Sequence, residues 1–242
     1  MKQDSKQALL THKDIIQNKS FLKKVYADFY QIFKSTNFPQ GPIVEIGSGG
    51  GFIKDIIPNA ITSDVVKGPG IDRVFSATKM PFKNNNVSAF LMIDVLHHIK
   101  DSEKALKEML RCLKVGGKVV MIEPYNSWWG GIIYKYIHPE KKSFNPKAGW
   151  KIKGRGRMSS SNPALPWIIF VRDKKVFQKK IPNLKLVKIL PHTPFRYLIS
   201  GGLTKYQFLP TFSYPLIRWF DDFISRLFPQ ISMFVTVELQ KV

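Results

Sequence analysis

The chain has 242 residues, enough to bury one hydrophobic core together with a smaller cap, and no run approaches the ~18 apolar residues of a membrane-spanning helix. A single cysteine, Cys112, excludes an internal disulfide framework, and we expect a cytoplasmic protein in which this thiol is a packing residue rather than a nucleophile. The net charge is +21, because 38 Lys and Arg face only 17 Asp and Glu.

The first segment predicts two helices. Apolar residues recur at helical spacing over residues 5–36, with a break near Asn18-Lys19-Ser20. We expect residues 1–41 to form a helical unit beside the core. These helices either cover a ligand site or simply pack on a sheet.

A glycine-rich turn follows a short apolar strand that begins at Ile43. Its residues are Gly47, Ser48, Gly49, Gly50 and Gly51. Such a turn lets a ligand approach the backbone closely, and amides at the start of the next helix can face it. The spacing excludes a dinucleotide fingerprint, because Phe52 stands where the third glycine is needed. A phosphate-binding loop is also excluded, because Lys54 lacks both the preceding glycine and the following hydroxyl. The pattern that remains is acidic-x-Gly-x-Gly-x-Gly, starting at Glu45.

Two further strands end in carboxylates. The segment 60–64 ends in Asp64, which can accept the hydroxyls of a ribose, and 89–93 is followed by Asp94. Strands and helices alternate up to Glu123, which predicts a parallel sheet with helices on both faces. Ligands bind at the carboxyl ends of such strands, where the glycine turn and both carboxylates fall.

Over residues 40–125 the chain resembles class I S-adenosylmethionine-dependent methyltransferases. The pattern from Glu45 to Gly51 matches the first motif of the family, and 76–82 is similar to its adenine-flanking segment, with Ser76 where aspartate is usual. Residues 113–123 resemble its Leu-Lys-Pro-Gly-Gly turn and fifth strand. The resemblance implies an α/β, Rossmann-like seven-stranded, mostly parallel sheet, with the cofactor-binding core at 42–124.

The resemblance also implies which residues contact S-adenosyl-L-methionine. They are Glu45, Gly47, Ser48, Gly49, Gly51, Asp64, Ala77, Thr78 and Asp94. Glu45 would orient the amino group, Asp64 would hold the ribose, and Asp94 would lie near the methionine end. Ala77 and Thr78 would offer backbone groups to the adenine.

A base is needed only if the methyl acceptor is a weakly acidic hydroxyl. His97 and His98 follow the fourth strand and titrate near neutrality. Only one of two neighbours can point into the site, and we favour His98; the alternative is a packing residue that bonds the backbone. No cluster has metal-ligand spacing, so no metal is expected.

The segment 125–182 is rich in aromatic and basic residues, and we expect it to form a cap. Residues 124–196 hold sixteen Lys and Arg against two acids, a net of +14. The run Lys151–Arg157 is the most basic part. His138, His192 and Arg196 also lie outside the cofactor core and are candidates to contact the acceptor.

In 183–242, two alternating segments predict the sixth and seventh strands, separated by a helical insertion at 191–230. The resemblance implies that these two strands form an antiparallel pair. Residues 216–228 form an amphipathic helix whose polar side carries both signs of charge. We therefore favour a lid whose apolar side packs on the core over direct contact with lipid.

These features predict O-methylation of a non-protein acceptor, anionic or lipid-linked, for example a glycan. Peripheral contact with the inner face of an anionic membrane would suit the charge, and nucleic acid is the less favoured partner. One alternative is an RNA-directed methyltransferase that grips phosphates with Lys151–Arg157. The other alternative is a protein that binds the cofactor without turnover. Its support is Ser76, which stands where the family usually has aspartate.

Overall fold

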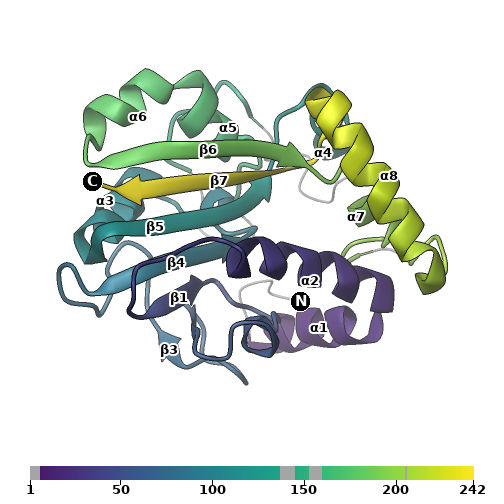
Figure 1. Cartoon of the computed structure of the whole chain (residues 1–242), viewed down its shortest axis with the longest axis horizontal. Helices are drawn as coiled ribbons and strands as arrows, with labels where there is room; N and C mark the ends of the chain where they lie inside the picture. The colour runs from purple at the N-terminus through teal and green to yellow at the C-terminus, as the bar shows by residue number, and fades with distance from the viewer. Residues whose placement is uncertain (1–5, 137–144, 153–159, 205) are drawn as a thin grey trace.

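The computed structural model describes residues 6–136, 145–152, 160–204 and 206–242. Its centre is a seven-stranded sheet in the order β3-β2-β1-β4-β5-β7-β6 (Figure 1). The strands are β1 (Ile43–Ile46), β2 (Ile61–Asp64), β3 (Arg73–Val74), β4 (Val87–Ile93), β5 (Leu113–Pro124), β6 (Leu184–His192) and β7 (Phe234–Lys241). Strands β1 to β5 pair in parallel, and β7 is antiparallel to both β5 and β6. The expected Rossmann-like sheet and its last antiparallel pair are confirmed.

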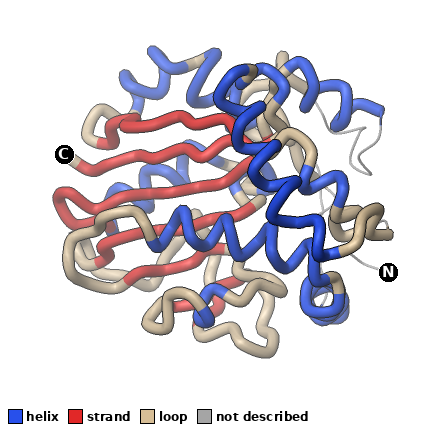
Figure 2. The backbone as a smooth tube through the Cα atoms, turned by 45° about the vertical axis from the view of Figure 1, so that its right-hand side comes forward, coloured by secondary structure: helices blue, strands red, loops and turns tan. Residues whose placement is uncertain are grey.

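Helices cover both faces of this sheet (Figure 2). They are α1 (Lys6–Asn18), α2 (Ser20–Lys34), α3 (Ser102–Cys112), α4 (Trp128–Tyr136), α5 (Leu165–Trp167), α6 (Lys174–Lys180), α7 (Arg196–Ile199) and α8 (Tyr214–Leu227). The predicted pair of N-terminal helices is confirmed, with its break at Lys19.

The alternation along β4 explains the two layers. Ala89 and Leu91 face a cluster built with α2, whereas Phe90 and Met92 face a cluster built with α3, α5 and α6. Both sets are fully buried, as expected for a central strand of a parallel sheet. The second half of the segment 125–182 therefore contributes α5 and α6 to the face of the sheet that α3 covers.

The helix expected after the glycine turn is absent from this described region. In its place is a single 3-10 turn, Ile53–Asp55. Pro58 lies close behind it and β2 begins at Ile61, so there is no room for a longer helix. Helix α2 covers this face of the sheet instead, with Phe21, Leu22, Val25, Phe29 and Phe33 buried.

Helix α8 is amphipathic as predicted, but the expectation that its apolar side packs on the core is wrong. Asp221 and Ser225 are buried on its inner side. Trp219 is 64% exposed and Leu227 is 55% exposed on its outer side. The reason is the Asp221 carboxylate on the inner side, which accepts the backbone amide of Phe195 just before α7. Within the described parts of the chain, no helix combines the length and hydropathy needed to span a bilayer.

Candidate functional site

The glycine turn is shaped by contacts that only glycine permits. Gly47 has a φ of 68°, and a Cβ there would lie 2.6 Å from a methyl carbon of Val95. The turn is tied to β2, because Ser48 donates its amide to the carbonyl of Ser63 at 2.9 Å. In return, the Ser63 amide donates to the Ser48 hydroxyl at 3.1 Å. The turn is thus fixed at the carboxyl ends of β1 and β2.

Glu45 is buried within β1, directly behind this turn. Burial raises the pKa of its carboxyl to about 7, and hydrogen bonds from Ser48 and Tyr30 partly offset the shift. Among the described residues no donor reaches the carboxylate oxygen Oε2. A buried acceptor without a donor fits a ligand that brings an N–H group, as the amino group of S-adenosylmethionine does.

Asp64 lies beside the turn, as expected for residues that hold one ligand. Its Oδ2 accepts the amide of Gly49 at 3.2 Å, and its Oδ1 accepts the amides of Val65 and Val66. The backbone carbonyl of Asp64 accepts the Phe75 amide at 3.0 Å. That bond brings the segment with Ala77 and Thr78 next to the end of β2. Ala77 is buried, whereas Thr78 is less buried and its hydroxyl bonds Ser76 at 2.9 Å.

Asp94 follows β4 with a φ of 57°, a left-handed conformation that is uncommon outside glycine. Its amide donates to the carbonyl of Ile122 at 2.9 Å, which holds it to β5. It lies near Tyr26 of α2, where burial first, and then the nearby Tyr197 and Asp94, raise the pKa of the tyrosine. Glu45, Asp64 and Asp94 therefore gather at the same edge of the sheet.

His97 is held by a buried carboxylate. Its Nδ1 lies 2.7 Å from Oε2 of Glu123, at the end of β5, and both side chains are buried. The other oxygen of Glu123 accepts the amides of Val95 and Leu96 at 2.8 and 2.6 Å. The His97 carbonyl accepts the Asn162 amide at 2.9 Å. His97 is thus fixed from both its ring and its backbone.

His98 stacks at a tilt on His97, with ring centroids 4.1 Å apart, and is less buried than its neighbour. The carboxylate contact thus belongs to His97, whereas the sequence favoured His98 as the base. Sequence reasoning did not assign Glu123 to the site. The available signal was an acid at the end of an otherwise apolar strand.

Helix α1 lies on the glycine turn, so one of the two N-terminal helices covers the candidate site. A Cβ at Gly50 would lie 2.4 Å from the backbone nitrogen of Lys13. Leu9 approaches Gly49 and Gly68 from the same helix. Helix α2 contacts the turn as well, because the hydroxyl of Tyr30 would meet a Cβ at Gly51. The turn therefore lies between α1 and α2.

The acceptor candidates outside the core do not join this cluster. His192 is buried between the hydroxyls of Thr193 and Thr236, and burial lowers its pKa to about 3. Arg196 is buried against carboxylates of α8. His138 and residues 153–157 of the basic run lie outside the described residues.

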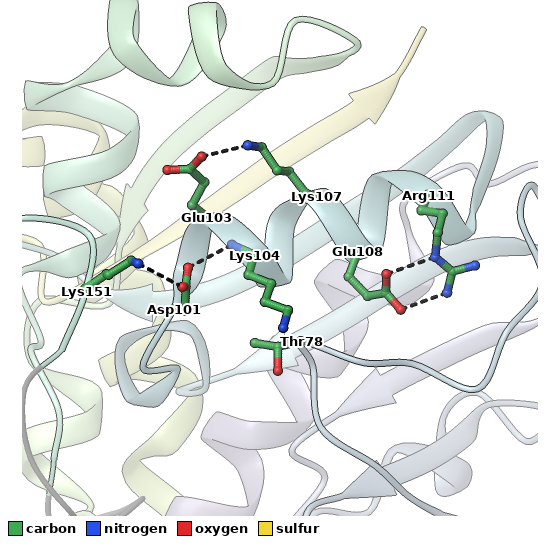
Figure 3. Close-up of a pocket in the computed structure, with 8 residues that line it drawn as sticks. All are labelled: Thr78, Asp101, Glu103, Lys104, Lys107, Glu108, Arg111 and Lys151. Carbon is green, nitrogen blue, oxygen red and sulfur yellow. Dashed lines mark hydrogen bonds and ion pairs between the residues drawn. The ribbon is translucent and has the colours of Figure 1, made fainter.

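A cavity of about 420 Å³ lies on the outer side of α3 (Figure 3). It is lined by Thr78, Asp101, Glu103, Lys104, Lys107, Glu108, Arg111 and Lys151. Six of its charged side chains form three ion pairs: Asp101 with Lys151, Glu103 with Lys107 and Glu108 with Arg111. Cys112, on the inner side of α3, is buried, and burial raises its pKa to about 11. The described side chains include no group of three His, Cys, Asp or Glu placed to hold a metal ion.

The segment that carries the glycine turn is similar to known proteins. Residues 44–121 match the model described as a methyltransferase domain. Demethylmenaquinone methyltransferase of Streptomyces avermitilis is 32% identical over 87 residues, which cover 36% of this chain and 34% of that protein. The chain thus matches about a third of the length of this curated relative.

Solved structures share the fold at low identity. Geranyl diphosphate C-methyltransferase from Streptomyces coelicolor, crystallised with S-adenosyl-L-homocysteine, has a TM-score of 0.51 and 14% identity, covering 91% of this chain and 78% of that chain. Phosphoethanolamine N-methyltransferase 2 of Haemonchus contortus has a TM-score of 0.53 and 14% identity. The match covers 99% of this chain and 58% of that chain. At these identities the likeness concerns the fold.

Proposed function

We propose that the chain is a class I S-adenosylmethionine-dependent methyltransferase, which its fold and its matched segment support, and that it methylates an oxygen of a non-protein acceptor. The observation that carries the choice of oxygen is the His97–Glu123 pair at the end of β4 and β5. A hydroxyl acceptor must lose a proton, and a histidine held by a carboxylate is suited to take it.

The cofactor-binding residues we propose are those that the fold gathers around the glycine turn. Glu45 offers the unpartnered Oε2 to a donor, and Asp64 offers its carboxylate to the ribose hydroxyls in exchange for the amide of Gly49. The segment with Ala77 and Thr78 lies beside Asp64. When bound, S-adenosylmethionine supplies a methyl group already activated on a sulfonium, so positioning and exclusion of water carry much of the rate.

We propose His97 as the base. The Nδ1–H to Glu123 bond selects the tautomer in which Nε2 carries the lone pair, and the carboxylate stabilises the ring once it is protonated. His98 is the second candidate, since its ring contacts that of His97. Asp94 follows β4 in a left-handed conformation and lies near Tyr26 of α2. We propose that it contacts the methionine end of the cofactor.

The acceptor we propose is anionic or lipid-linked, for example a glycan. The net charge of +21 supports an acceptor with negative charge, since a positive field of this size raises the local concentration of anions. The aromatic residues of 125–182 support a glycan or another acceptor with apolar surface.

Three measurements test this function in order. Calorimetry on the full chain should detect S-adenosylmethionine binding, and Asp64→Ala should weaken it; the absence of binding by the wild type would end the proposal. Incubation with methyl-labelled cofactor and fractionated cell extract should then label polar lipid or glycan fractions. Mass spectrometry of the product should place the methyl on oxygen. Label confined to RNA would instead support the RNA-directed alternative, and binding without any label would support the non-catalytic one.

A further inference from the structure

The exposed apolar surface of the chain is concentrated in one segment. Of the twenty large apolar side chains that are exposed in the described residues, ten lie within 206–228. They are Tyr206, Phe208, Leu209, Phe212, Leu216, Trp219, Phe220, Phe223, Leu227 and Phe228. Isolated exposed apolar residues are common on soluble proteins, whereas large exposed apolar patches mark interaction surfaces, so this concentration in one segment points to an interaction surface there.

Five of these residues form one face of α8. Leu216, Trp219, Phe220, Phe223 and Leu227 follow the spacing of three and four residues that aligns side chains along a helix. The rings of Trp219 and Phe223 stack with centroids 5.9 Å apart and an interplanar angle of 9°. We call this set the α8 apolar face.

The opposite side of α8 holds its carboxylates, of which Asp221 faces the protein and Asp222 is partly exposed. Asp221 is buried and accepts the amide of Phe195 at 2.8 Å, while Arg196 lies against both Asp221 and Asp222. Arg218 pairs with Asp28 of α2 at 3.0 Å. The acids beside α8 are therefore neutralised by arginines of the chain, and the outward surface is apolar.

We propose that the α8 apolar face docks on the surface of an anionic phospholipid bilayer, with the helix lying in the plane of the interface. A helix with Trp, Phe and Leu on one side and its polar groups on the other inserts its apolar side at the headgroup boundary. The charge of the chain selects this occupant over a second copy of itself. Two chains that each carry +21 repel one another, whereas an anionic surface attracts either.

The position of α8 gives the docking a consequence. The chain leaves β6 at His192 and enters β7 at Phe234, and both residues lie at the edge where β5 ends at Pro124. Helix α8, between them, therefore stands at the end of the sheet that also carries Glu45 and Asp94 (Figure 1). Docking through α8 brings this end of the sheet close to the lipid. Binding to vesicles does not depend on the proposed acceptor and can be measured without activity.

The test is flotation of the full chain with vesicles. Vesicles of equal parts phosphatidylcholine and phosphatidylglycerol should carry the wild type upward, and vesicles of phosphatidylcholine alone should carry much less of it. The double variant Trp219→Asp, Phe223→Asp should lower the bound fraction by about tenfold, because charge on the apolar face opposes insertion. Val115→Asp is the control for a negative charge placed away from α8: Val115 is exposed, lies near the start of β5 at the opposite end of the sheet, and its replacement should leave binding almost unchanged.

Light scattering after size-exclusion chromatography measures the mass of the protein in solution and so distinguishes docking on lipid from association with a second copy of the chain. The proposal is overturned if the wild type fails to float, or if it is a dimer in solution that the double variant dissociates. It is also overturned if the double variant, with circular dichroism like that of the wild type, floats as well as the wild type. Equal loss of binding in Val115→Asp would assign the attraction to net charge alone and would overturn the role of α8.

Discussion

Asp221 and Arg196 fix the orientation of α8. Asp221 accepts the Arg196 amide at 3.3 Å through Oδ1, and its other oxygen lies 3.6 Å from the Arg196 guanidinium. Both residues are buried, so α8 can turn neither carboxylate nor arginine to water without losing these contacts. The pair therefore determines that the apolar face of α8 points outward.

Replacing Asp221 with Ala should destabilise the fold by about 2–4 kcal/mol, because it leaves the backbone amides of Phe195 and Arg196 without their acceptor and removes one of the two carboxylates beside the buried guanidinium. Urea unfolding monitored by fluorescence measures the change. Asp222→Ala is the control, since Asp222 contacts the same arginine but is 41% exposed, and its cost should stay below about 1 kcal/mol. Equal costs would contradict the role given to Asp221.

The stability of the cofactor-free protein should fall as pH rises toward neutrality because of Glu45. Its folded-state pKa, about 7, lies above the ordinary value of 4.5, so the folded state binds the proton more tightly than the unfolded state. The contribution is complete below about pH 4.5 and is lost as pH rises through 7, with a full span of about 3 kcal/mol. Denaturant titrations across this range should show a smaller fall for Glu45→Gln than for the wild type. A parallel dependence in both proteins would exclude Glu45 as the cause.

Cofactor affinity should change with pH in the opposite direction. The ionised form of Glu45 is the better acceptor for a cationic amino group, and burial keeps part of the population protonated near pH 7. Affinity measured by calorimetry should therefore rise about eightfold from about pH 6 to about pH 7.5, as the ionised fraction of a group with a pKa of about 7 does. Glu45→Gln should bind more weakly and with a flat profile. A flat profile in the wild type would show that Glu45 does not contact the amino group.

Gly50→Ala should displace α1 from the glycine turn. The added methyl would lie 2.4 Å from the backbone nitrogen of Lys13, and a backbone atom cannot give way as the end of a side chain can. We expect a loss of about 1–3 kcal/mol and faster trypsin cleavage after Lys13. Gly149→Ala, where an added methyl meets no atom within 4 Å, is the control. Unchanged cleavage in Gly50→Ala would mean that α1 does not cover the turn in solution.

His97→Asn should lower kcat by about 10²–10³-fold and leave cofactor affinity unchanged if His97 is the base. Glu123→Gln should lower kcat as well and shift the pH profile, because the amide no longer stabilises a protonated ring, while its oxygen still accepts the amides of Val95 and Leu96. His98→Asn is the informative comparison. A larger loss there than in His97→Asn would assign the base to His98.

The sequence by itself determined the parts of the fold that depend on local pattern. The glycine turn, the carboxylates at strand ends and the alternation of strands and helices predict a parallel sheet and its binding edge, because each signal lies within a few neighbouring residues. The amphipathic pattern of 216–228 likewise predicts a helix.

What the tertiary structure decided depends on residues far apart in the chain. The pattern of α8 does not tell which side faces inward, since that is set by Arg196, which lies 25 residues before Asp221. His97 and Glu123 are 26 residues apart and meet only because β4 and β5 are neighbours in the sheet. The cover that α1 places on Gly50 is likewise a contact between distant segments. Local periodicity shows which elements form, whereas packing between distant segments decides which of their side chains meet.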